Sequence, residues 1–312
     1  MVRRMLSKIH LSRGGVWIDL VSPTAEEETD VERTLAVDVP TVDEIRRFEP
    51  SSRFYREGDA VYMAARIVVQ QGDEKPQTAN LAIILAGENL VTVRYVESRS
   101  FVLVAEEVTR ADTRMGAVAT LVLLIEALVD RTSERIEKAA AATDELVASA
   151  LPSGVQPPRR WKADELGIVL AEIQSLHRDV ARARESLVSL GRMTGYLVAQ
   201  RDRHDTETWS RARSVSRDVA AVSDHASFVA QNIQFVLDTL LGLISVEQNA
   251  IVKFFSIVAV VLLPPTLIAA IYGMNFVHMP ELGWRWGYPI ALLVMLASAV
   301  GPYLWCRRRG WL

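Results

Sequence analysis

The sequence has few residues of the kinds that build disulfides, metal sites or catalytic centres. Among its 312 residues are one cysteine, Cys306, and five histidines. A single cysteine excludes an internal disulfide framework and a cysteine-based zinc site. The sequence also contains no GxxxxGK[ST] phosphate loop, no HExxH motif and no GxSxG motif. We therefore predict that the chain is not an enzyme and that it drives no transport by its own ATP hydrolysis.

The chain also has no excess of positive charge. The formal net charge is −3 at pH 7, which argues against nucleic acid as the main partner. The charge is unevenly placed, because residues 253–312 hold five basic side chains and one acid, whereas residues 1–252 hold 30 basic and 37 acidic ones. Half of all residues are hydrophobic although 23% are charged. This segregation predicts an acidic N-terminal part and an apolar C-terminal part with basic flanks.

Two segments near the C-terminus contain no charged residue at all. Residues 254–272 and 288–306 are each 19 residues long. At about 1.5 Å per helical residue, each covers roughly 28 Å, close to the hydrocarbon core of a bilayer. A buried core helix would explain one such run, but two in tandem predict a pair of transmembrane helices in contact with membrane lipid.

The flanking charges predict how these helices are oriented. Lys253 precedes the first span and Arg307–Arg309 follow the second, whereas the loop 273–287 holds Arg285 balanced by Glu281. Basic residues favour the cytoplasmic side of a membrane. We therefore expect a multi-pass protein of the cell (inner) membrane, with both termini in the cytoplasm and the loop 273–287 outside.

The N-terminal part has the pattern of a mixed α+β domain over residues 1–110. A capping-box pattern opens a helix at Thr41–Glu44, and Pro23 with the acids after it marks the start of an earlier helix. Short β-branched runs separated by turn signals predict strands. These runs are Val16–Leu20, Ala60–Val69, Thr78–Leu85 and Leu90–Tyr95.

Long helices are predicted for residues 111–252. The stretches 113–150, 161–200 and 206–252 are separated by clear breaks, and the last contains no proline before the membrane. We expect its helix to run unbroken into the first span, and the remaining residues, 253–312, to form the transmembrane domain. Such a helix is either a plain coiled-coil spacer or a stalk that lines a pore and transmits a signal, and its periodicity leaves both open.

The first span ends in Gly273, Met274 and Asn275. Glycine and asparagine tolerate left-handed backbone and commonly end a helix, which is the structural alternative to a functional role. However, stepping back from Gly273 at helical spacing gives a stripe that is small or mildly polar at most positions. The stripe comprises Ala270, Thr266, Leu263, Ala259, Ser256, Val252 and Asn249. A semi-polar stripe inside an apolar span faces a partner helix or water. Because two spans cannot enclose a pore, this predicts several copies around an axis, each contributing its first span.

The C-terminal residues closely resemble the CorA family of bacterial Mg²⁺/Co²⁺ channels. The matching motifs are Glu247-Gln-Asn249, Leu263-Pro-Pro-Thr266, Gly273-Met-Asn275, Met279-Pro-Glu-Leu282 and the basic tail ending in Gly310-Trp-Leu312. The resemblance implies a homopentamer, with a funnel of cytoplasmic α/β domains, a stalk helix continuous with the first span, and a pore lined by that span. It also implies influx of Mg²⁺, and of Co²⁺ and Ni²⁺, driven by the membrane potential.

Two other functions compete with this one. Zinc transporters of the ZntB type are similar in architecture, but they usually carry a different residue where Met274 stands and lack the Met-Pro-Glu-Leu loop. A membrane-anchored signalling or scaffold protein is the alternative from another class. The order and number of the motifs favour a Mg²⁺ channel over both.

The resemblance assigns roles to individual residues. Gly273, Met274 and Asn275 would form the selectivity filter, where neutral oxygens accept hydrogen bonds from the water shell that Mg²⁺ sheds reluctantly. Leu263 and Val252 would form apolar constrictions, and Thr266 and Asn249 would form intermediate polar rings.

Acidic residues would serve outside the span. Glu281 in the outer loop would raise the local cation concentration, or is simply a solvated acid. The resemblance also implies a cytoplasmic Mg²⁺ sensor formed by acids between subunits, for which Asp218 and Asp238 are candidates, with Asp73 or Glu74 as their partners. The alternative for each of these acids is a solvated position on the protein surface.

Overall fold

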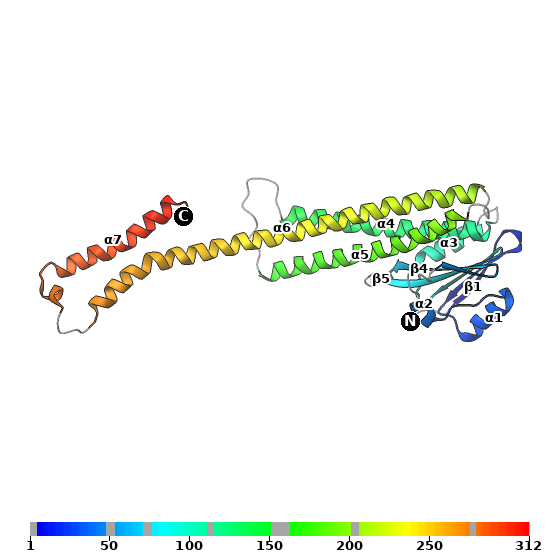
Figure 1. Ribbon diagram of the computed structural model, residues 1–312, viewed down its shortest axis with the longest axis horizontal. Coiled ribbons are helices and arrows are strands. Elements are labelled where there is room, and N and C mark those ends of the chain that lie inside the picture. Colours follow the sequence, from blue (N-terminus) through cyan, green and yellow to red (C-terminus); the bar gives the residue numbers. More distant parts are fainter. Residues whose placement is uncertain are drawn as a thin grey trace. The chain divides into compact units, whose positions relative to one another are not determined.

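The structure of the protein is a computed structural model (Figure 1). It describes residues 5–47, 54–70, 76–110, 115–150, 163–200, 206–274 and 279–311. The chain divides into two compact units, Met1–Leu237 and Asp238–Leu312. The first unit contains a sheet and most of the helices, and the second contains the apolar end of the longest helix and the helix that follows it.

A six-stranded sheet forms the centre of the N-terminal region. Its strand order is β1-β2-β6-β5-β4-β3, and β2 pairs with β6 in parallel while all other pairs are antiparallel. The strands are β1 (Met5–His10), β2 (Val16–Val21), β3 (Phe54–Glu57), β4 (Ala60–Val69), β5 (Gln77–Ala86) and β6 (Asn89–Arg94). The four predicted strands correspond to β2, β4, β5 and β6, whereas the edge strands β1 and β3 were not predicted.

Two short helices, α1 (Ala25–Leu35) and α2 (Val42–Arg47), begin at residues that cap them. At α1, Thr24 N–H donates to Glu27 Oε2 over 2.8 Å, and Glu27 N–H donates back to Thr24 Oγ1 over 3.3 Å. Thr24 is therefore the N-cap, and the proline before it lies outside the first turn. At α2, the predicted capping residue Thr41 donates from its N–H and its hydroxyl to Glu44, over 2.9 and 2.8 Å. These hydrogen bonds lower the pKa of Glu44.

Apolar side chains cover one face of the sheet and bury α1 and α2 against it. Leu20, Ile84 and Val91 are fully buried there, with Val31 of α1 and Ile45 of α2 at most 3% exposed. On the other side of the sheet lie α3 (Arg99–Arg110), α4 (Ala117–Ala150) and α5 (Ala163–Ala199). The N-terminal region therefore has its own hydrophobic core.

Long helices occupy the rest of the chain, as the sequence predicted. After α4 and α5 comes α6 (Thr206–Tyr272), then a 3₁₀ turn, η3 (Pro280–Gly283), and α7 (Gly287–Arg308). The predicted break at 151–158 lies outside the described residues. These elements confirm the predicted fold class, an α+β region followed by long helices and two C-terminal apolar helices.

Candidate ion pathway

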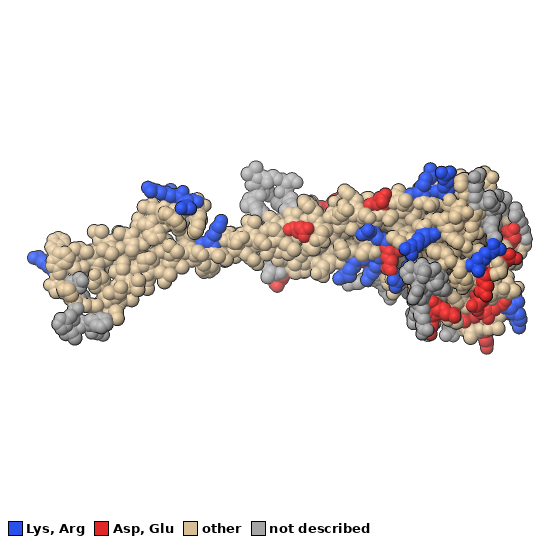
Figure 2. Space-filling view, viewed as in Figure 1, with Lys and Arg blue, Asp and Glu red and all other residues tan. Residues whose placement is uncertain are grey.

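The C-terminal unit exposes most of its apolar side chains. Two helices of the described chain, α6 and α7, are long and apolar enough to cross a membrane, and only 6% and 11% of their most apolar windows are buried. A core helix of a soluble protein would be mostly buried instead. Figure 2 shows this part of the chain as almost uncharged, with Lys and Arg gathered at its ends. α6 ends at Tyr272, the last residue of the predicted first span, and α7 contains the whole predicted second span.

The two apolar helices shield each other along one side. On α6 the least exposed residues of the apolar section recur at helical spacing, and so do those of α7. They are Ile257, Val261, Pro264, Pro265 and Ile268 on α6, and Gly287, Ala291, Met295, Ser298, Ala299, Pro302 and Cys306 on α7. Ile257 is 8% exposed and Cys306 is 1% exposed, although little else in this unit could cover them. The geometry is that of a helical hairpin in which each helix has one less exposed side, called the seam below.

The predicted pore stripe lies on the opposite face of α6 from this seam. At 100° per residue, Ser256, Leu263 and Ala270 lie about 100° to 180° around the helix from Ile257 and Val261. Every position of the stripe, from Asn249 to Gly273, is exposed. The stripe is therefore free to face other copies of the chain or an aqueous path, whereas α7 occupies the other side.

Local hydrogen bonding leaves acceptor oxygens available on this helix. The Thr266 hydroxyl donates to the carbonyl of Leu262 over 2.7 Å, so its oxygen keeps lone pairs directed outward. Pro264 and Pro265 lie inside the helix and have no N–H to donate. They leave the carbonyls one turn earlier, those of Val260 and Val261, without their usual helical donor. Of these oxygens, that of Thr266 lies on the exposed stripe and can accept a hydrogen bond from a hydrated cation.

The end of α6 is tightly wound around Gly273. Gly273 N–H donates to the Ala269 carbonyl over 3.0 Å, and Met274 N–H donates to the Ile271 carbonyl over 3.2 Å. A methyl group on Gly273 would lie 3.2 Å from the Ala269 oxygen, closer than most real contacts. The helix therefore ends at Tyr272, and Gly273, the first residue of the predicted filter, has no side chain. Asn275 lies outside the described residues, and so does the side chain of Glu281, whose backbone is in η3.

The two predicted sensor acids that the structure describes, Asp218 and Asp238, do not meet within one chain. Burial raises the pKa of Asp130, and the nearby carboxylates of Glu126, Asp218 and Glu134 raise it further. Asp218 of α6 therefore lies close to a group of acidic side chains on α4. Arg211 neutralises part of this negative charge through an ion pair of 2.7 Å with Glu126.

Asp238 is twenty residues further along α6 than Asp218. This places it about 30 Å along the helix and about 160° around it. Asp73 and Glu74 lie outside the described residues. Within the described ranges, no group of three His, Cys, Asp or Glu side chains could hold a metal ion. A sensor site built from these acids therefore needs residues of another copy of the chain or residues outside those ranges.

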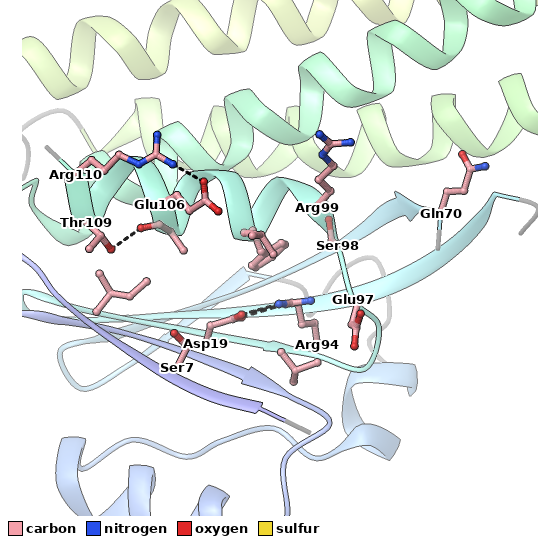
Figure 3. Close-up of a pocket in the computed structure, with 15 residues that line it drawn as sticks. Ser7, Asp19, Gln70, Arg94, Glu97, Ser98, Arg99, Glu106, Thr109 and Arg110 are labelled. Atoms are coloured by element: carbon pink, nitrogen blue, oxygen red, sulfur yellow. Dashed lines mark hydrogen bonds and ion pairs between the residues drawn. The ribbon is translucent and has the colours of Figure 1, made fainter. Parts of the chain in front are cut away.

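A separate cavity of about 800 Å³ lies between α3 and strands β1, β2 and β6 (Figure 3). On its floor Arg94 and Asp19, 5% and 7% exposed, form an ion pair of 2.7 Å. Thr92 donates to Asp19 over 2.7 Å, and the remaining Arg94 nitrogen donates to the Val96 carbonyl over 2.7 Å. Because both charged groups are satisfied by the protein, this pair stabilises the fold and offers no open group to an ion. The sequence analysis missed the pair.

The family model and the curated relatives agree on one family, and a solved structure shares the fold. The family model "CorA-like Mg2+ transporter protein" matches residues 12–308. The magnesium transport protein CorA of Haemophilus ducreyi is 31% identical over 302 residues, which cover 95% of this chain and 92% of that protein. CorA of Escherichia coli K12 is 31% identical over 305 residues with the same coverage. The structure of a CorA magnesium transporter from Methanocaldococcus jannaschii superposes over the full length of both chains, with a TM-score of 0.79 and 16% identity.

Proposed function

The chain belongs to the CorA-like Mg²⁺ transporter family, which is a family of ion transporters and not of enzymes, and from this we propose that it carries Mg²⁺ into the cell. The relatives named as magnesium transport proteins cover nearly the whole chain, including both apolar helices. The observation that carries the proposal is the exposed semi-polar stripe of α6, which faces away from α7 and leads to Gly273 and Met274.

We propose that the pore is shared between copies of the chain. Two helices cannot surround an ion path, and the stripe from Asn249 to Gly273 is the face that α7 leaves uncovered. Five copies around an axis, in membrane lipid, would bring their first spans together as a homopentameric funnel. The membrane domain would comprise residues 253–312, the stalk residues 111–252 and the cytoplasmic α/β domain residues 1–110. With basic residues at both inner ends, the termini would face the cytoplasm and the loop 273–287 the outside.

Selection of the ion would occur at Gly273, Met274 and Asn275. Mg²⁺ holds its waters tightly, so a filter of neutral oxygens can bind the hydrated ion without stripping it. The stripe contains no acid that would hold the ion too strongly. Thr266 would add a ring of hydroxyl oxygens, and Leu263 and Val252, 65% and 62% exposed in one chain, would form apolar constrictions. Moving two charges into a negative interior releases roughly 4–5 kcal/mol per 100 mV, so no coupled ion is needed.

We also propose that cytoplasmic Mg²⁺ regulates the flux through acids at subunit contacts. Asp218 fits this role because a divalent cation would relieve the crowding of carboxylates that raises the pKa of Asp130. Asp238, Asp73 and Glu74 remain candidates for the same sensor. Glu281 would attract cations at the outer mouth. The Asp218→Asn/Asp238→Asn double variant should lose inhibition by internal Mg²⁺ while its influx at low internal Mg²⁺ stays normal.

Competitive uptake into proteoliposomes at an imposed inside-negative potential tests the function. We expect Mg²⁺ influx that rises with the potential and that Co²⁺ and Ni²⁺ inhibit because they pass through the same filter. Zn²⁺ influx without Mg²⁺ influx would instead identify a zinc transporter of the ZntB type. Absence of any divalent flux from correctly inserted protein would leave only the membrane-anchored scaffold.

A further inference from the structure

Helix α7 ends in a turn that folds the chain back onto the helix. Gly310 has a φ of +69°, in the left-handed region that glycine adopts without strain. Its N–H donates to the Arg307 carbonyl over 3.1 Å, and the N–H of Trp311 donates to the Cys306 carbonyl over 3.1 Å. The two hydrogen bonds and the glycine define a Schellman motif. The motif returns Trp311 to the helix, where its ring meets that of Trp305.

Two tryptophan rings and one guanidinium group pack together at this turn. The rings of Trp305 and Trp311 meet edge to face with their centres 5.8 Å apart. The guanidinium carbon of Arg309 lies 5.1 Å from the centre of the Trp305 ring. Stacking holds a guanidinium group by its face and leaves the N–H donors at its edge free. Because Trp305 is 50% exposed and Trp311 is 47% exposed, this group is an ordered surface and not a buried core.

The described acids leave the positive charge at this turn unbalanced. Arg307, Arg308 and Arg309 are all exposed, and beyond residue 252 the sequence contains one acid, Glu281. Within the described ranges, no Asp or Glu side chain forms an ion pair with any of the three arginines. The carbonyls of residues 305–307 do not need the arginine side chains either, because the N–H groups of residues 309–311 donate to them. The guanidinium N–H donors can therefore bind an anion from outside the chain.

Two of the three arginines flank the tryptophan rings and the third does not. At 100° per residue, Arg308 and Arg309 lie about 60° and about 40° around the helix from Trp305, whereas Arg307 lies about 160° away. We call Trp305, Arg308, Arg309 and Trp311 the C-terminal cluster. Arg307 has the same charge and lies on the same turn, but it is outside the cluster.

The position of the C-terminal cluster indicates its occupant. Residues 288–306 contain no charge, so the arginines stand where the hydrocarbon core of the membrane ends and the lipid headgroups begin. Basic side chains gather at this end of the chain in Figure 2. Tryptophan suits the same level because its ring is apolar and its N–H is a donor. A phospholipid offers an acyl chain to the rings and phosphate oxygens to the guanidinium groups, which bind phosphate through paired N–H donors.

We propose that the C-terminal cluster binds the phosphate of an anionic phospholipid. Arg308 and Arg309 donate to the phosphate oxygens, and the rings of Trp305 and Trp311 contact the glycerol group and the upper part of an acyl chain. A zwitterionic headgroup fits less well, because its ammonium group is repelled by the arginines. The bound lipid holds the end of α7 at a fixed depth in the membrane. The inference needs the apolar helices to lie in a membrane and does not depend on which ion the protein carries.

Lipid binding to the full-length protein tests the proposal. The protein is freed of lipid in a neutral detergent, phosphatidylglycerol or phosphatidylcholine with the same acyl chains is added, and bound lipid is counted by native mass spectrometry. Arg309→Gln removes one charge from the C-terminal cluster, and Trp311→Ala removes one ring. Arg309→Lys keeps the charge but loses the planar guanidinium group. Arg307→Gln is the matched control, because it removes the same charge from the other side of the helix.

We expect the wild type to bind phosphatidylglycerol severalfold more tightly than phosphatidylcholine. Arg309→Gln and Trp311→Ala should lose most of this preference, Arg309→Lys should lose part of it, and Arg307→Gln should keep it. The melting temperature of each variant in detergent without added lipid should equal that of the wild type, because all of these side chains are exposed.

Three results would each overturn the site. Equal losses in Arg307→Gln and Arg309→Gln would mean that charge alone attracts the lipid, and equal binding of both lipids by the wild type would mean that the anionic headgroup is not recognised. Glycerol phosphate, the soluble part of the same headgroup, is added as a competitor. Displacement of the lipid by an equal concentration of it would mean that the cluster binds free phosphate groups. Mg²⁺ flux enters none of these measurements and tests the proposed function separately.

Discussion

The two units of the chain use apolar residues in opposite ways. In the N-terminal unit they are inside: Leu20 and Ile84 are fully buried between the sheet and α1 and α2. In the C-terminal unit they are outside: Leu263 is 65% exposed and Leu293 is 68% exposed in a single chain. The first unit can therefore be stabilised by its own core, whereas we propose that the second depends on lipid and on other copies. Substitutions should accordingly affect stability in the first unit and ion transport in the second.

The largest effect is expected at the end of the pore stripe. We predict that Asn275→Gly and Asn275→Asp both abolish selective Mg²⁺ uptake while the protein still inserts and assembles. Glycine deletes the amide oxygen, and aspartate places up to five negative charges in a narrow ring, where repulsion and tight cation binding disturb conduction. Uptake by each variant in proteoliposomes, with the oligomer checked by size-exclusion chromatography, measures this. Normal uptake by Asn275→Gly would mean that the residue only ends a helix.

In the N-terminal unit the largest effect should come from the buried ion pair. Arg94→Met leaves the Asp19 carboxylate buried without its partner, which should lower the free energy of unfolding by about 3–5 kcal/mol. Arg110→Met is the control, because Arg110 and its partner Glu106 are 76% and 51% exposed and their pair should contribute less than about 1 kcal/mol. Urea unfolding followed by circular dichroism compares the two. Equal losses would show that Asp19 is not stabilised by Arg94.

The contrast between the two units was only partly predictable from the sequence. Features with a local sequence pattern could be predicted, and contacts between distant residues could not. The charge-free spans and the motif around Gly273 are local patterns, so α6, α7 and the family followed from the sequence. The strands β2, β4, β5 and β6 also carry local signals. The pair of Asp19 and Arg94 could not be foreseen, because it depends on the parallel register of two strands 75 residues apart in sequence.

One other omission has a different cause. The edge strand β1 was missed because its residues, Met5–His10, mix basic and apolar side chains without strict alternation.

Matched leucine substitutions compare the two units through a smaller effect, the loss of unfolding free energy when one leucine side chain is shortened. Leu20→Ala removes a fully buried side chain and should cost about 2–5 kcal/mol of unfolding free energy. Leu293→Ala on α7 removes one that is 68% exposed, and it should cost less than about 1 kcal/mol because lipid replaces the lost contacts. Thermal unfolding in detergent measures both. A large loss for Leu293→Ala alone would mean that this face is a protein contact.

The smallest expected effect concerns the acids near α1 and α2. Burial, and then the carboxylates of Glu32, Glu44 and Glu57, raise the pKa of Asp38. A raised pKa in the folded state means that the charged form opposes folding at neutral pH and that this cost disappears as pH falls through the raised pKa. Asp38→Asn should therefore raise the melting temperature slightly at pH 7, and the difference should vanish below about pH 4. A difference that persisted in acid would exclude the electrostatic cause.

The mass of the transport-competent protein tests the shared pore most directly. Protein that carries Mg²⁺ in vesicles is extracted in detergent and measured by native mass spectrometry. We predict a protein mass near five times that of the 34.7 kDa chain, because only several copies of α6 can enclose the stripe from Asn249 to Gly273. A stable monomer or dimer that still carried Mg²⁺ would contradict the account.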